Sequence, residues 1–263
     1  MSNKSDKKPI NRKSLKPLRA RDKTDSFATK IPIMPSLPMR LLINGRSGSG
    51  KSSLLLSLFL QDDYPYKNIF NDGDNIYVFS PCAAGGSDYK LDVLIEEMSV
   101  PDSNCFDDID DDLINDLYDN IVEDYREKIR NKEKPENILI IIDDFSSSGV
   151  MSSKRFNAVA KLFCNSRKVL CSIVVLQQSY LHTNKTIREN ATGLILFNTS
   201  QKSLEAIEGD NNYLKSKKQF FTMFRENVIE AHDFLAIVYS NTHKDMYLNS
   251  SFEVIDTNKY LKK

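Results

Sequence analysis

The sequence predicts an α/β fold, in which a mostly parallel central sheet is flanked by helices and a pair of strands closes the C-terminal end. Three observations lead to this prediction. Short aliphatic segments alternate with amphipathic ones, which is the order of a parallel sheet crossed by helices. The run ILIII at 138–142 contains no polar residue, as expected for a strand buried on both faces. A phosphate-loop motif at 45–52 lies between an aliphatic segment and a helical one, which places the loop at the carboxyl edge of the sheet.

The N-terminal half of the predicted sheet follows an extended, proline-punctuated lead-in at 31–38. Apolar residues spaced three and four apart predict the long helix of this half, and its acidic outer face is interpreted as a solvated surface. The expected elements are strand 39–44, helix 53–60, strand 76–79 with a turn at Gly85 and Gly86 beyond it, and helix 111–134.

The C-terminal half continues the alternation. The expected elements are strand 138–142, a helix marked by Phe156, Val159, Ala160 and Phe163, strands 172–176 and 193–197, helices near 203–209 and 213–226, and a closing strand pair at 234–239 and 246–248. The chain therefore divides into a basic arm over 1–30, a P-loop domain over 31–250 and a tail over 251–263.

Charge is unevenly distributed, although the 36 basic and 36 acidic residues balance over the whole chain. The arm over 1–30 carries ten basic residues against three acidic ones and few apolar ones, which predicts disorder. Contact with nucleic-acid phosphates and a plain solvated or targeting tail both remain open for it. The four cysteines form no C-x-x-C pair, which argues against zinc and for a reducing compartment. The longest apolar run, at 54–60, is too short to span a membrane.

The motif G-x-x-x-x-G-K-[ST] assigns a physical task to each part of the loop. Glycine allows the backbone N–H groups to turn inward around phosphate oxygens. Lys51 can reach the β- and γ-phosphates, and Ser52 can hold Mg²⁺. Arg46 can contact the nucleotide or point to solvent. The expected nucleotide-binding residues are Gly45, Arg46, Ser47, Gly48, Ser49, Gly50, Lys51 and Ser52.

Two carboxylates follow the aliphatic strand at 138–142. Asp143 is expected to hold Mg²⁺ together with Ser52, directly or through water. Asp144 lies one residue further on, where a carboxylate can orient or deprotonate the attacking water. An Asp–Asp turn that merely ends a core strand is the alternative, but the phosphate loop upstream favours nucleotide hydrolysis.

Two further polar residues flank the strand at 172–176. Gln178 follows it and can contact the γ-phosphate or the attacking water, although an ordinary amide bonded to backbone is the alternative. Arg167 precedes it and can reach the γ-phosphate of a neighbouring subunit, or serve as a solvated cation at a helix end. Arg155, Arg188 and Arg225 are weaker candidates for the same role in trans.

Together these motifs resemble those of FtsK–HerA-type ATPases, in particular the poxvirus-type genome-packaging ATPases of large double-stranded DNA viruses and their virophage relatives. The resemblance rests on the phosphate loop, on Asp143 and Asp144, and on the segments NSRKV at 165–169, QSY at 178–180 and NKTIR at 184–188. It covers roughly residues 39–200. Many members of the family carry glutamate where this chain has Asp144.

The resemblance implies a RecA-like core, ATP as the nucleotide and a ring of identical subunits that drives double-stranded DNA into a capsid. It implies that Lys51, Ser52 and Asp143 bind phosphate and Mg²⁺. It also implies that Gln178 senses the γ-phosphate and that Arg167 acts in trans. A capsid or membrane-vertex protein is the implied partner. The cytoplasm or viral factory of an infected cell, and the virion, are the implied locations.

Three other functions are alternatives to a packaging ATPase. A cellular-type HerA-like translocase or helicase shares the motifs, and the sequence alone distinguishes it poorly from a packaging ATPase. A nucleotide kinase or phosphotransferase shares the loop but usually adds an arginine-rich lid, and no such cluster follows residue 150. A GTPase needs an N-K-x-D motif, which NKTI at 184–187 does not supply.

Overall fold

A computed structural model describes residues 27–81, 89–145, 151 and 157–261 of the chain. Within these residues the strands form one eight-stranded sheet in the order β3-β2-β4-β5-β1-β6-β7-β8. Pairing is parallel from β3 to β6 and antiparallel from β6 through β7 to β8. The predicted fold class, a mostly parallel sheet with a C-terminal strand pair, is confirmed.

The elements have the following bounds. The strands are β1 Arg40–Asn44, β2 Ile76–Phe79, β3 Cys105–Phe106, β4 Ile138–Asp143, β5 Cys171–Gln177, β6 Gly193–Phe197, β7 Phe234–Val238 and β8 Tyr247–Leu248. The helices are α1 Lys51–Leu60, α2 Tyr89–Glu97, α3 Asp111–Asn131, α4 Ala158–Asn165, α5 Lys185–Asn190, α6 Gln201–Asn211, α7 Lys217–Asn227 and α8 Asn258–Leu261.

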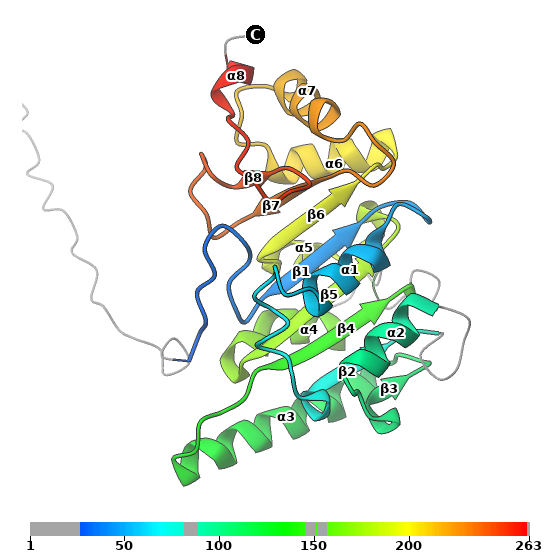
Figure 1. The fold of residues 1–263 in the computed structure, drawn as a ribbon, viewed down its shortest axis with the longest axis vertical. Coiled ribbons are helices and arrows are strands. Elements are labelled where there is room, and N and C mark those ends of the chain that lie inside the picture. Colours follow the sequence, from blue (N-terminus) through cyan, green and yellow to red (C-terminus); the bar gives the residue numbers. More distant parts are fainter. Residues whose placement is uncertain (1–26, 82–88, 146–150, 152–156, 262–263) are drawn as a thin grey trace, which may run out of the picture.

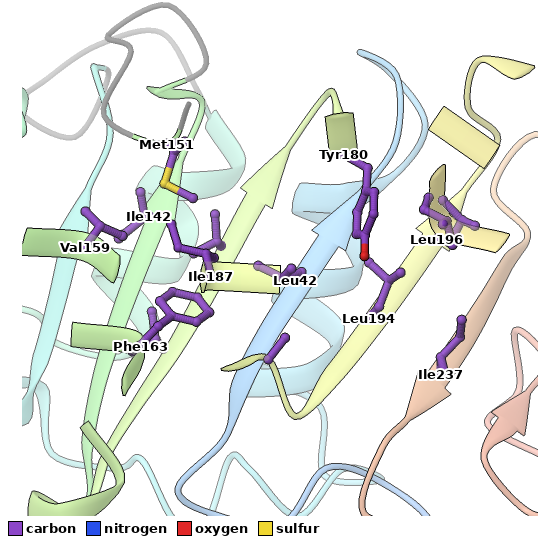
Figure 2. Close-up of a cluster of buried hydrophobic side chains, with 14 of the residues drawn as sticks. Leu42, Ile142, Met151, Val159, Phe163, Tyr180, Ile187, Leu194, Leu196 and Ile237 are labelled. Carbon is purple, nitrogen blue, oxygen red and sulfur yellow. The ribbon is translucent and has the colours of Figure 1, made fainter. Parts of the chain in front are cut away.

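Helices cover both faces of the sheet, so the protein has three layers (Figure 1). On one face α1 and α2 pack over β1, β2 and β4. On the other, α3 to α7 cover a second apolar cluster, part of which is drawn in Figure 2. Neighbouring residues of β1 alternate between the two clusters: Leu42 enters one, while Leu41 and Ile43 enter the other. This explains why the predicted strands read as unbroken aliphatic runs.

Local signals explain where the long helix starts and stops. The side chain of Asp110 accepts a hydrogen bond from the N–H of Leu113 at 2.8 Å and caps the start of α3. Lys132 takes a left-handed conformation with φ 62° and ends the helix. The predicted helix 111–134 therefore ends three residues early, at Asn131.

The two helices predicted near 203–209 and 213–226 are present with shifted bounds, since α6 runs over Gln201–Asn211 and α7 begins only at Lys217. Helices α2, α5 and α8 and strand β3 were not predicted. Gly85, Gly86, Phe156 and most of the basic arm lie outside the described residues. Among the residues that the structure describes, no helix has the length and apolar character needed to cross a membrane.

Candidate functional site

The phosphate loop joins the carboxyl end of β1 to the first turn of α1, as the motif predicts. Its conformation requires glycine for two different reasons. Gly48 and Gly50 have φ values of 75° and 106°, which residues other than glycine rarely adopt. At Gly45 there is no room, because an added Cβ would lie 2.5 Å from Ser49 Oγ and 2.6 Å from Phe197 Cβ. The loop is therefore held open as a backbone cradle at the N-terminus of α1.

Lys51 contacts the backbone of its own loop. Its Nζ donates to the carbonyl of Gly45 at 2.9 Å and to that of Arg46 at 3.1 Å. Burial lowers the pKa of Lys51, while the carboxylates of Asp143 and Asp144 act in the opposite direction. A bound triphosphate would offer stronger, charged acceptors to the same ammonium group.

Asp143 and Asp144 occupy different environments at the end of β4. Asp143 is the last strand residue and is only 6% exposed, whereas the side chain of Asp144 is exposed. Asp144 has φ 53°, a left-handed conformation that aspartate tolerates better than most side chains. β5 lies between β4 and β1, so the carboxylates reach the loop across one intervening strand.

Two consecutive glutamines lie at the end of this intervening strand: Gln177 is its last residue, and Gln178 follows it. Gln178 Nε2 donates to Asp144 Oδ1 at 2.9 Å, which joins two of the residues predicted to be catalytic. Gln177, which sequence reasoning passed over, is 5% exposed and accepts a hydrogen bond from Thr183 Oγ1. Its Nε2 finds no hydrogen-bond partner among the described residues. A buried donor without a partner is costly, so this amide is a candidate ligand contact.

Most of the predicted site residues surround a single cavity of about 450 Å³. It is lined by Ser47, Gly48, Gly50, Lys51, Ser52, Lys90, Asp143, Asp144, Leu176, Gln177, Gln178 and His232. Arg46 does not line it and has an exposed side chain, so its contact with a nucleotide stays a prediction. Gly45 and Ser49 are buried and do not line the cavity either.

The cavity also contains two basic residues that the sequence analysis did not select. Lys90, in the first turn of α2, donates from Nζ to Ser53 Oγ at 2.6 Å. His232 precedes β7 and places Nδ1 3.2 Å from the carbonyl of Ser49. Both come from segments that carry no motif, so no local pattern could have singled them out.

No candidate arginine of the described residues lines this cavity. Arg225 lies in α7, and Arg155 lies outside the described residues. Arg167 precedes the amino end of β5, whereas the phosphate loop follows the carboxyl end of the parallel strand β1. The seven residues of β5 separate the two edges by roughly 20 Å. Arg188 binds the carboxylate of Asp210 and lies over the ring of Tyr180, 5.0 Å from its centre. Arg188 therefore has a structural task within its own chain.

Tyr180 anchors the segment that follows Gln178. Its hydroxyl donates to Asp210 Oδ2 at 2.9 Å, and burial raises its pKa to about 12. The ring is fully enclosed in the cluster of Figure 2. The position of Gln178 is thus fixed on one side by β5 and on the other by this tyrosine.

The residues present fit a Mg²⁺–triphosphate. No group of three or more His, Cys, Asp or Glu side chains suited to a metal occurs in the described part of the chain. Mg²⁺ is usually held by one or two carboxylates, with substrate phosphates and water completing its shell. Asp143 and the hydroxyl of Ser52 line the same cavity and would provide the protein's share of such a shell.

Comparisons with known proteins agree with this fold. The genome packaging NTPase B204 from Sulfolobus turreted icosahedral virus 2, in complex with AMPPCP, is similar with a TM-score of 0.54 and 15% identity, over 81% of this chain and 96% of that one. EssC (ATPases 2 and 3) from Geobacillus thermodenitrificans is similar with a TM-score of 0.55 and 12% identity, over 86% of this chain and 42% of that one. At these identities the similarity shows a shared fold.

No curated protein matches the chain. The profile of the poxvirus A32 protein family, in contrast, matches residues 32–263, which is nearly the whole chain. The resemblance to poxvirus-type packaging ATPases that the motifs suggested is confirmed at the level of family and fold. The chain belongs to the poxvirus A32 protein family.

Proposed function

We propose that this protein is a Mg²⁺-dependent ATPase that moves double-stranded DNA into a viral capsid. The observation that carries the proposal is the convergence of Lys51, Asp143 and the Asp144–Gln178 pair on one cavity. The family supports a viral role, and B204, whose structures include a complex with ATP-gammaS, is described as a genome packaging NTPase.

Each residue has a distinct part in the proposed hydrolysis. The loop N–H groups and Lys51 hold the phosphates, and Lys51 stabilises charge that develops on the γ-phosphate. Ser52 and Asp143 would hold Mg²⁺, which supplies charge neutralisation at the phosphate oxygens. Asp144 accepts a proton from the attacking water, and Gln178, bonded to Asp144, orients that carboxylate and the water.

The proposed role is tested by steady-state ATP hydrolysis with and without nucleic acid. We expect stimulation by double-stranded DNA that is independent of its sequence and declines with salt, because the contacts are to phosphates. Forked DNA serves as the control for a HerA-like helicase, since a packaging motor need not separate strands. ATP hydrolysis that is indifferent to DNA of every length and at every salt concentration would contradict the motor proposal.

The proposed motor is a ring in which Arg167 acts on the site of the next subunit. Arg167 is exposed and lies at the edge of the sheet opposite the cavity, so it cannot serve its own site. Mixing inactive Arg167→Ala and Lys51→Ala subunits is expected to restore part of the DNA-stimulated activity. Lys51→Ala subunits retain the arginine, and Arg167→Ala subunits retain an intact phosphate loop. If Arg167 is only a solvated cation, Arg167→Ala alone will have normal activity.

The proposed motor also needs a docking partner and a location in the infected cell. We propose a capsid or membrane-vertex protein as the docking partner and the cytoplasm or viral factory of the infected cell as the location, with association to the virion during packaging.

A further inference from the structure

The phosphate loop lies between two different groups of strands. The carboxylates come from β4, which is separated from β1 by β5. On the other side of β1 lies β6, and then β7. Because β7 runs antiparallel to β6, with Phe234 opposite Phe197, the residues that precede β7 come to the carboxyl edge of the parallel strands. The segment between α7 and β7 therefore reaches the phosphate loop from the side opposite the carboxylates.

His232 is the residue of this segment that lines the cavity. Its Nδ1 lies 3.2 Å from the carbonyl oxygen of Ser49, 183 residues away in sequence. A carbonyl oxygen only accepts hydrogen bonds, so Nδ1 carries the hydrogen in this contact. In the neutral ring Nε2 is then a hydrogen-bond acceptor. Nδ1 also lies 3.1 Å from where a Cβ on Gly50 would be, so the ring packs closely on the loop.

The segment that carries His232 is held firmly in place. The Oδ2 of Asp233 accepts the N–H groups of Glu230 at 2.8 Å and Ile229 at 3.1 Å, and these hydrogen bonds, that of Glu230 first, lower its pKa. Ser250 Oγ donates to the other carboxylate oxygen at 3.3 Å. Phe234 packs on Phe197 with ring centres 5.4 Å apart. These contacts fix the backbone beside His232, whose side chain is exposed, so little backbone freedom is lost there when a ligand binds.

The two sides of the loop differ in chemistry, and this difference gives a bound nucleotide a direction. The groups suited to the reacting γ-phosphate, which are Asp144, Gln178 and the Mg²⁺ residue Asp143, lie on the β4 and β5 side. The nucleoside then extends towards β6 and β7, where His232 lies. We infer that His232 binds the nucleoside of ATP, with Nε2 accepting a hydrogen bond from a ribose hydroxyl or from the amino group of the base. This inference rests on the proposed ATPase function.

Two substitutions of His232 distinguish the role of Nδ1 from that of Nε2. His232→Asn keeps an amide that can donate to the Ser49 carbonyl but places nothing at the position of Nε2. His232→Gln places an amide oxygen near that position. Calorimetric titrations with ADP and with inorganic pyrophosphate then compare a nucleotide with its phosphates alone. One neutral hydrogen bond corresponds to a change of roughly 5- to 10-fold in Kd.

We expect His232→Asn to weaken ADP binding by about that factor, to leave pyrophosphate binding unchanged, and to be partly rescued by His232→Gln. If the wild type binds 2′-deoxy-ADP more weakly than ADP by the same factor, the ribose hydroxyl is the donor. If it binds inosine diphosphate more weakly by that factor, the amino group of the base is the donor. Equal weakening of ADP and pyrophosphate, or no weakening of either, overturns the inference. The function proposal fails separately, if the wild type binds neither ligand or if Lys51→Ala binds both normally.

Discussion

Replacement of Lys51 by alanine is expected to reduce ATP turnover by roughly 10²- to 10³-fold, the loss typical of removing one preorganised donor to developing charge. The ammonium group of Lys51 contacts only loop carbonyls in the hydrogen bonds that the structure describes, at 2.9 and 3.1 Å. Arg46 is exposed, so water can bind its carbonyl in place of the ammonium group. The variant should therefore fold normally, and its defect should appear in nucleotide binding and turnover.

Thermal unfolding measures that binding directly. A ligand at 100 times its Kd stabilises the folded state by about 2.7 kcal/mol. For a chain of this size each kcal/mol raises Tm by about 2–4 °C, so ATP with Mg²⁺ should raise the Tm of the wild type by roughly 5–10 °C. In Lys51→Ala the Tm without nucleotide should be nearly unchanged and the shift with nucleotide largely absent.

Lys67→Ala provides a matched control. Lys67 is a lysine in the same α1–β2 region, and its Nζ pairs with Asp62 at 2.7 Å on the surface. Exposed ion pairs contribute about 0–1 kcal/mol, so this variant should keep both the turnover and the nucleotide-dependent rise in Tm. Undiminished turnover in Lys51→Ala would remove the basis of the proposed site.

The parts of the fold that sequence analysis predicted are those specified by local pattern. Strand β4 and the phosphate loop were located because burial on both faces demands an unbroken aliphatic run, and a backbone cradle demands glycine. Helix α5 escaped prediction because its six residues are too few to show a period. It starts where the side chain of Asn184 accepts the N–H of Thr186 at 2.8 Å.

The candidate site could be predicted only where its residues lie in motifs. Lys51, Asp143 and Gln178 each follow or precede a recognisable strand, and the parallel register brings their strand ends to one edge. His232 and Lys90 reach the cavity through strand order and helix packing, which no short sequence window contains. Gln177 could not be selected from the sequence either, since only the structure shows that its amide is buried whereas that of Gln178 is exposed.

Replacement of Asp144 by asparagine is expected to lower kcat by about 10²- to 10⁴-fold with little change in the KM for ATP, as befits the loss of a general base. Asparagine suits this position because it tolerates the left-handed conformation that Asp144 adopts, with φ 53°. Its amide oxygen can still accept the hydrogen bond that Gln178 now donates at 2.9 Å. The substitution therefore removes the charge and basicity of the group while preserving the local geometry.

Asp143→Asn is the matched variant, since it removes the neighbouring carboxylate from a buried position that is 6% exposed. It should raise the Mg²⁺ concentration needed for half-maximal activity, an effect that Asp144→Asn should lack. Asp144→Glu restores the carboxylate with one more methylene and should recover part of kcat. If Asp144→Asn shifts the Mg²⁺ requirement and leaves kcat at saturating Mg²⁺ intact, then Asp144 is a metal residue and the proton must go elsewhere. The ratio of the two effects in the two variants thus decides which carboxylate at the end of β4 acts on Mg²⁺ and which acts on water.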